Sequence, residues 1–102
     1  MKSPVFAVLY RPGPRWDKNV PFQEQQGVSE HRDFLKARDD DGTLLFGGPF
    51  LDDSGGLAVY AAMPEDALKS LLQQDGSVSS GLLTYEVHPY TIAFSNASAL
   101  ST

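Results

Sequence analysis

The sequence contains two histidines and no cysteine, and His31 is its strongest candidate for acid–base chemistry. His31 shares an apolar stripe, at helical spacing, with Val28, Phe34 and Leu35. An imidazole titrates near neutral pH and can serve as a general acid or base. A partly buried histidine that is hydrogen-bonded to a backbone carbonyl would show the same pattern. The absence of cysteine excludes thiolate catalysis and disulfides, and two histidines are too few for a multi-histidine metal site in one copy.

Asp75 is the second candidate. It stands four residues after Leu71 and seven after Leu68, so it continues the apolar stripe of a second predicted helix. A carboxylate on the inward side of a helix C-terminus is unfavourable because it is buried and faces the negative end of the helix dipole. A protonated His31 nearby would remove this cost. We therefore predict that His31 and Asp75 lie within hydrogen-bonding reach, with a helix-ending turn at Gly76 as the alternative.

Arg15 and Trp16 lie in a long loop that follows the first predicted strand and extends to about Gln23. With Arg11 and Lys18, this loop gathers positive charge in a protein of net charge −5. One interpretation is a site for a small anion, in which Arg15 holds the anion and Trp16 its ring. The other is a solubilising loop with Trp16 folded onto the domain. The first interpretation predicts that both residues line the same pocket as His31.

Other motifs mainly exclude functions. Gly47-Gly48-Pro49 lacks the spacing of a phosphate-binding loop and is more typical of a backbone that approaches a neighbour or ligand closely. No Gly-x-Ser-x-Gly motif is present, which argues against a serine hydrolase. The run Asp39-Asp40-Asp41 lacks the spacing of an EF-hand calcium loop and predicts a solvated turn. We expect no metal and no cofactor.

The elements that must position these residues follow from periodicity and turn signals. Strands are predicted over 5–10, 43–50, 57–62 and 83–94, with helices from about 24 or 29 to 38 and from 64 to 75, and a polar connection over 77–81. The order β-α-β-β-α-β predicts a ferredoxin-like α+β fold, an antiparallel sheet with two helices on one face. The first strand is apolar at both parities, so we expect a second copy to cover the other face and form a homodimer.

Length and charge bound the rest. The 102 residues predict a single domain over 1–94 and a flexible tail over 95–102. The net charge of −5 repels phosphate backbones and argues against nucleic acid as a partner. No apolar run approaches the roughly 20 residues of a membrane helix, and the N-terminus does not resemble a signal peptide. We therefore expect no membrane association and a cytoplasmic location.

Several motifs together resemble the YCII-related (YciI-like) family. They are Pro12-Gly13-Pro14-Arg15-Trp16, Glu30-His31-Arg32-Asp33-Phe34-Leu35, Gly42-Thr43-Leu44-Leu45-Phe46-Gly47-Gly48-Pro49-Phe50 and Asp75, spread over roughly residues 5 to 92. The resemblance implies a dimeric α/β-barrel built on the ferredoxin-like fold, akin to muconolactone isomerase, with a His–Asp active site at His31 and Asp75. The family usually has Asp-Pro where this chain has Asp75-Gly76. It fixes no substrate, although one branch resembles dehydrochlorinases of chlorinated aromatic degradation.

These observations predict a small cofactor-free enzyme, an isomerase or a dehydrochlorinase-like lyase. His31 would move a proton on a small anionic substrate of cyclic or aromatic structure, while Asp75 orients and stabilises the imidazole. The residues expected to bind the substrate are Arg15, Trp16, Tyr10, Gly48, Pro49 and Phe50. The alternative is a non-catalytic dimeric module that binds a small ligand or acts as an accessory protein.

Overall fold

A computed structural model describes residues 3–96 of the chain. The elements are β1 (Val5–Pro12), the 3₁₀ helix η1 (Phe22–Glu24), α1 (Val28–Asp40), β2 (Leu44–Pro49), β3 (Gly56–Tyr60), α2 (Glu65–Leu72), α3 (Gly76–Ser79) and β4 (Leu83–Tyr90). The predicted order β-α-β-β-α-β is confirmed, with the short helix α3 added before the last strand. The predicted flexible tail lies outside the described residues from residue 97 onward.

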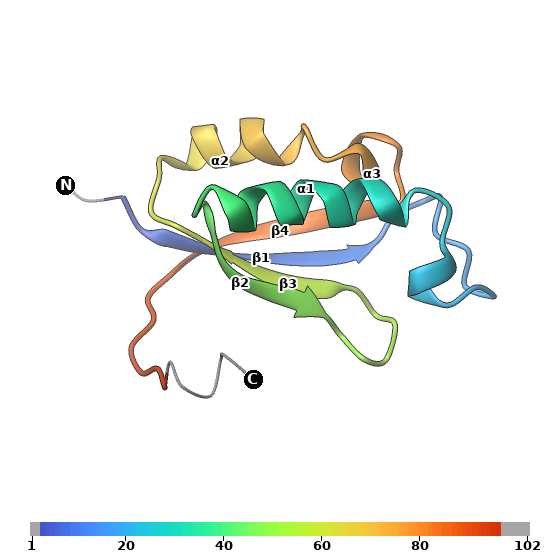
Figure 1. Cartoon of the computed structure of the whole chain (residues 1–102), viewed down its shortest axis with the longest axis horizontal. Coiled ribbons are helices and arrows are strands. Elements are labelled where there is room, and N and C mark those ends of the chain that lie inside the picture. Colours follow the sequence, from blue (N-terminus) through green and yellow to red (C-terminus); the bar gives the residue numbers. More distant parts are fainter. Residues whose placement is uncertain (1–2, 97–102) are drawn as a thin grey trace.

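The four strands form one antiparallel sheet in the order β2-β3-β1-β4, and the helices lie on one of its faces (Figure 1). Helix α1 connects β1 to β2, and β3 pairs between these two strands. This is the split βαβ arrangement, so the ferredoxin-like fold is confirmed. The register places Tyr10 of β1 opposite Gly56 on one side and Tyr85 on the other.

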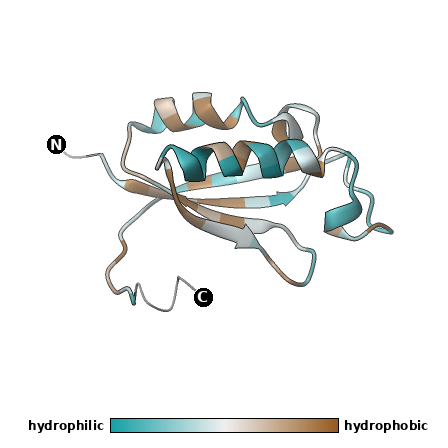
Figure 2. Ribbon diagram, in the orientation of Figure 1, coloured by the Kyte–Doolittle hydropathy of each residue, from teal (hydrophilic) through white to brown (hydrophobic). Residues whose placement is uncertain are grey.

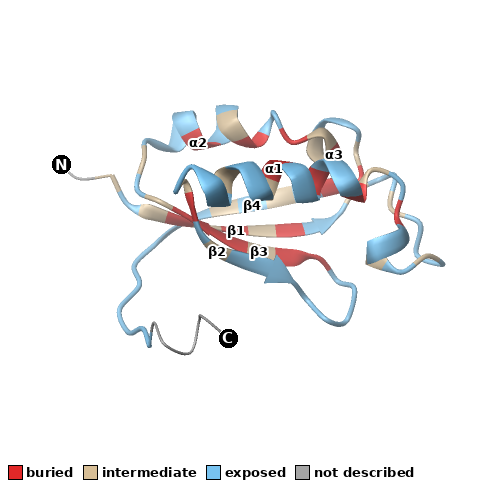
Figure 3. Cartoon of the chain, viewed as in Figure 1, coloured by how far each residue is buried: buried red, intermediate tan, exposed pale blue. Residues whose placement is uncertain are grey.

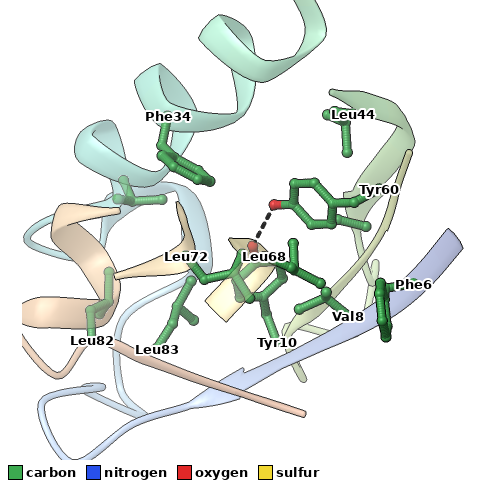
Figure 4. Close-up of a cluster of buried hydrophobic side chains, with 12 residues drawn as sticks. Phe6, Val8, Tyr10, Phe34, Leu44, Tyr60, Leu68, Leu72, Leu82 and Leu83 are labelled. Atoms are coloured by element: carbon green, nitrogen blue, oxygen red, sulfur yellow. Dashed lines mark hydrogen bonds between the residues drawn. The ribbon is translucent and has the colours of Figure 1, made fainter. Parts of the chain in front are cut away.

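The core lies between the sheet and the helices, where brown and red segments face each other in Figures 2 and 3. Phe6, Val8 and Tyr10 point from β1 toward buried residues of the helices, among them Leu68 and Leu72 (Figure 4). Burial of each such apolar side chain contributes about 1.5–3 kcal/mol relative to exposure. The alternation of side chains along β1 therefore anchors one face of the strand, and Tyr10 marks where the core reaches the site described below.

The opposite face of the sheet carries the other parity of β1. Val5, Ala7 and Leu9 are half-buried there, and the register places Ala7 beside Val59 and Leu9 beside Leu57. No helix covers this face in the part of the chain that the structure describes (Figure 1). The sequence pattern thus reflects two apolar faces, only one of which is covered by the chain's own helices.

Several element boundaries differ from those predicted. Helix α1 begins at Val28, one residue before the later of the two predicted starts and four after the earlier one, because Gly27 has a φ of 98° and separates it from η1. The helix continues through Asp39 and Asp40, and the latter pairs with Lys36 at 2.6 Å across one turn. Strand β4 ends at Tyr90, not at Phe94.

The Gly47-Gly48-Pro49 segment lies at the end of edge strand β2. A Cβ atom on Gly47 would come within 3.0 Å of the Leu57 carbonyl oxygen in β3. Gly47 therefore permits close pairing of the two strands, as the sequence interpretation proposed. None of the helices within residues 3–96 is long and apolar enough to cross a membrane.

Candidate active site

Asp75 is fully buried and stands at the start of a helix, not at the end of one. Helix α2 ends at Leu72, and Asp75 is the N-cap of α3. Its Oδ1 accepts hydrogen bonds from the backbone N–H of Ser77 at 2.9 Å and from the Ser77 hydroxyl at 2.7 Å. The predicted position at a helix C-terminus was therefore wrong. The predicted polar connection over 77–81 includes the last residues of α3, because the carboxylate caps a new helical turn there.

Gly76 is the first residue of α3. Proline is well tolerated at this position because its missing N–H would have no partner within the helix. The usual Asp-Pro of the family and the Asp75-Gly76 of this chain are thus two solutions to the same helix start. Glycine does not displace the capping carboxylate here.

The Nδ1 atom of His31 lies 2.6 Å from Oδ2 of Asp75. His31 comes from the first turns of α1, which packs beside α3, and it is 8% exposed whereas Asp75 is 0% exposed. The structure thus brings together His31 and Asp75, which the sequence analysis paired because both lie on the apolar stripes of predicted helices. A charge-assisted hydrogen bond of this length, shielded from water, is among the stronger polar contacts in a protein.

The hydrogen bonds of Asp75 define how the imidazole is protonated. The carboxylate accepts at both oxygens, and Ser77 supplies both donors to Oδ1. Nδ1 of His31 therefore donates to Oδ2, and Nε2 is the atom left for a substrate. Within residues 3–96, Nε2 has no hydrogen-bond partner, and no fully buried side-chain nitrogen or oxygen lacks one. Nε2 is consequently accessible.

A cavity of about 130 Å³ opens beside His31, between the first half of α1, η1 and the end of the sheet that carries the β2–β3 hairpin. Its wall is mainly apolar. The apolar lining residues are Phe22, Val28, Leu35, Pro49, Leu57 and Leu83; the glycines are Gly48, Gly55 and Gly56; the polar ones are Tyr10, Gln23, His31 and Arg32. An apolar pocket with a few convergent polar groups is the usual form of a small-molecule site.

Among residues 3–96, Arg32 is the one lysine or arginine in the wall of this pocket. Its Nη2 atom donates a hydrogen bond of 2.8 Å to Oε1 of Gln23, which also lines the pocket. A guanidinium has five donors, so this bond leaves others for an anion. The positive charge at the site thus comes from α1.

Three of the six predicted substrate-binding residues line this pocket, and the other three do not. Tyr10, Gly48 and Pro49 line the pocket, whereas Arg15, Trp16 and Phe50 are not among its lining residues. The prediction that Arg15 and Trp16 share the pocket of His31 is thus corrected by the structure, and Arg32 stands where Arg15 was expected.

Backbone contacts explain this placement. The N–H of Arg15 bonds to the carbonyl of Gly81 at 2.9 Å, and the Arg15 side chain lines a separate hollow with Glu30. Trp16 stacks on Phe22, with ring centroids 5.6 Å apart, and supports the pocket wall from behind. This matches the alternative in which the tryptophan folds onto the domain.

Sequence reasoning missed Gln25, Gln23 and Arg32. Gln25 is buried and organises the long loop: its Nε2 donates to the carbonyls of Asp17 and Val20, and its Oε1 accepts from the Asp17 N–H. A glutamine that stands between Glu24 and Gln26 in a polar segment gives no signal for such a role. Arg32 had one usable signal, since it directly follows His31 in the helix.

Among residues 3–96, no three histidine, aspartate or glutamate side chains lie close enough together to hold a metal ion. The polar groups that the structure gathers are therefore a histidine with its carboxylate and a neighbouring cation. Their chemistry is proton transfer and anion binding.

Residues 7–91 match the YCII-related domain, which is most of the chain, and the protein belongs to this family. Its structure is similar to that of the 5-chloro-2-hydroxyhydroquinone dehydrochlorinase TftG from Burkholderia phenoliruptrix AC1100, determined in complex with 2,5-dihydroxybenzoquinone. The TM-score is 0.63 and the identity 17%, over 85% of this chain and 93% of that one. No curated protein matches the sequence. At this identity, the similarity establishes the shared fold.

Proposed function

We propose that this protein is a small proton-transfer enzyme, an isomerase or a dehydrochlorinase-like lyase, whose substrate is a compact anionic ring. The observation that carries the proposal is the pairing of His31 with the buried Asp75 at 2.6 Å, beside an apolar cavity. A carboxylate in this position holds an imidazole in one tautomer and stabilises the imidazolium that forms during the reaction. The structural similarity to a dehydrochlorinase supports the same reaction class.

In this mechanism, Nε2 of His31 removes a proton from a carbon or hydroxyl of the substrate. The electron pair of the broken bond forms a new double bond in the ring system. In an elimination on a chlorinated hydroquinone, the imidazolium first passes this proton to the ring carbon that bears chlorine. Removal of a proton from a second hydroxyl then forms a C=O bond, shifts the adjacent ring double bond and expels chloride, and the imidazolium releases that second proton to water. In an isomerisation, the imidazolium returns the proton to another carbon. Asp75 remains ionised throughout and stabilises the charged imidazole.

Two probes test the proposal. With 5-chloro-2-hydroxyhydroquinone, we expect enzyme-dependent chloride release; with 2,5-dihydroxybenzoquinone in D₂O, we expect accelerated exchange of the ring hydrogens, followed by proton NMR. Saturable binding of either compound without reaction would instead support the non-catalytic ligand-binding module. Failure to bind or transform either compound would contradict the proposed substrate class.

Arg32 gives a prediction about binding. Replacing Arg32 with glutamine should weaken the binding of 2,5-dihydroxybenzoquinone by roughly 10- to 100-fold, because a hydrogen bond to a charged group contributes about 1.5–3 kcal/mol. Calorimetric titration measures the change. Lys36→Gln on the same helix is the matched control, since Lys36 pairs with Asp40 and does not line the pocket. Equal affinities for the two variants would remove Arg32 from the site.

We also propose that two copies pack through the uncovered face of the sheet. Ala7 and Leu9 of β1 are half-buried there, and an apolar face of this kind is commonly covered by a partner. Light scattering at micromolar concentration should give about twice the chain mass of 11.1 kDa.

A matched pair of alanines tests which face is used. Ala7→Glu places a charge on the uncovered sheet face and should give monomers, whereas Ala67→Glu on the exposed side of α2 should leave the dimer intact. A wild-type particle of 11.1 kDa would rule out the dimer, and dissociation by Ala67→Glu alone would place the interface on the helices.

A further inference from the structure

Two tyrosines are paired in the core directly beneath the candidate site. The hydroxyls of Tyr10 in β1 and Tyr60 in β3 lie 2.7 Å apart, joined by the dashed line in Figure 4. Tyr10 is 2% exposed and Tyr60 is 0% exposed. Both side chains point to the helix-covered face of the sheet, where their other neighbours are mainly apolar.

The ring of Tyr10 also touches His31. The two ring centroids are 4.7 Å apart and the ring planes meet at 70°, an edge-to-face contact. The imidazole is thus held at Nδ1 by Asp75 and along its ring by Tyr10. One hydrogen bond alone leaves an imidazole free to rotate about it, so the aromatic contact fixes the direction in which Nε2 points.

The hydroxyl pair in turn fixes Tyr10. A phenol ring in an apolar core can tilt, but its hydroxyl must keep a hydrogen-bond partner because an unpartnered buried hydroxyl is costly. Among residues 3–96, the hydroxyl of Tyr10 forms its hydrogen bond with the hydroxyl of Tyr60. Burial raises the pKa of Tyr60 to about 12 and raises that of Tyr10 as well, so both phenols are neutral at physiological pH and the pair is an O–H···O bond.

We propose that Tyr60 is a positioning residue for His31 and acts through Tyr10. The Tyr60 hydroxyl sets the tilt of the Tyr10 ring, and the edge-to-face contact passes this orientation to the imidazole. Two phenylalanines would fill the same space without the cost of burying two hydroxyls. Packing alone therefore does not require the hydroxyl pair, and we assign it a role in orienting His31. The inference rests on the proposed function for its kinetic consequence but not for its structural one.

The test compares three tyrosine-to-phenylalanine variants. Tyr60→Phe and Tyr10→Phe each remove one side of the hydroxyl pair and keep the ring. Tyr85→Phe is the matched control, because Tyr85 is the cross-strand neighbour of Tyr10 but its hydroxyl accepts a bond from Gln73 at 3.2 Å, so its loss leaves the Tyr10–Tyr60 pair intact. We expect Tyr60→Phe to lower kcat about tenfold with KM changed less than about twofold, as expected when reacting groups are slightly misplaced. Tyr85→Phe should have the wild-type kcat.

NMR of the His31 imidazole separates this inference from the proposed function, since it needs no substrate. Tyr60→Phe and Tyr10→Phe should both shift the ring ¹⁵N and ¹H resonances of His31, and Tyr85→Phe should not. If the first two variants keep the wild-type spectrum, the tyrosine pair serves folding alone and the proposal is overturned. If the spectra shift but the wild-type protein turns over neither probe, the positioning is supported while the enzymatic function fails. If Tyr60→Phe does not fold, Tyr10→Phe provides the same test from the other side of the bond.

Discussion

Asp75→Asn is expected to leave the protein folded and to reduce proton transfer by about 10³–10⁴-fold. The asparagine carbonyl can still accept the two Ser77 donors that bind Oδ1. The asparagine amide, however, is a donor where Oδ2 accepts from His31 at 2.6 Å. The imidazole must then carry its proton on Nε2, so the atom that faces the pocket loses its lone pair. The exchange rate of 2,5-dihydroxybenzoquinone in D₂O measures the loss, and ¹⁵N NMR reports the tautomer.

Asp75→Ala provides the contrast. It removes the cap of α3 and leaves buried His31 without its partner, and breaking a buried pair costs about 3–5 kcal/mol. For a domain of this size, each kcal/mol lowers Tm by about 4–8 °C. Thermal unfolding should therefore separate the two variants clearly. If Asp75→Asn kept full activity with the Nε2–H tautomer, His31 would not be the base.

His31→Gln is expected to lower the rate of chloride release and of hydrogen exchange by about 10²–10⁴-fold, the usual contribution of a general acid or base. The glutamine amide can donate to Asp75, so the buried carboxylate keeps a partner and the fold should persist. Affinity for 2,5-dihydroxybenzoquinone should change much less than the rate, because the apolar wall and Arg32 remain.

His88→Gln is the matched control for this substitution. His88 lies exposed on β4, 3.3 Å from Glu86, and does not line the pocket. Its replacement should leave both rates unchanged. Added imidazole should partly restore exchange in His31→Ala, which vacates the space of the ring. A His31→Gln protein as active as His88→Gln would refute general acid–base catalysis by His31.

The order of elements could be predicted because each signal is local. The signals are the continuous apolar run of β1, the proline before α2 and the turn residues between β2 and β3, and each acts over a few residues. Helix α3 was not predicted because a helix of four residues, Gly76–Ser79, is too short to show periodicity. It exists because Asp75 caps it and because its turn packs against α1, and the second cause is tertiary.

The site was predictable only in part. Asp75 points inward as expected, but not because it continues the apolar stripe of α2, which ends at Leu72. It points inward because it caps the start of α3. Positive charge near the site was expected in the loop with Arg15. That loop is tied to the segment before β4 by backbone bonds from Arg15 to Gly81 and from Gly13 to Leu82. These partners are far apart in the sequence, so residue spacing could not predict them, and Arg32 supplies the charge instead.

The two oxygens of Asp75 have different partners, and this limits which positions of the chain can change during evolution. One oxygen caps α3 and the other holds His31, so most replacements at this position lose the chemistry and the fold together. Substitutions at Asp75 are therefore selected against twice, once because they impair folding and once because they impair activity. On the opposite wall of the pocket, the η1 side chains of Phe22 and Gln23 take part neither in the cap of α3 nor in the bond to His31. New specificities in descendants of this chain should accordingly arise by substitution there, around a nearly invariant proton-handling centre.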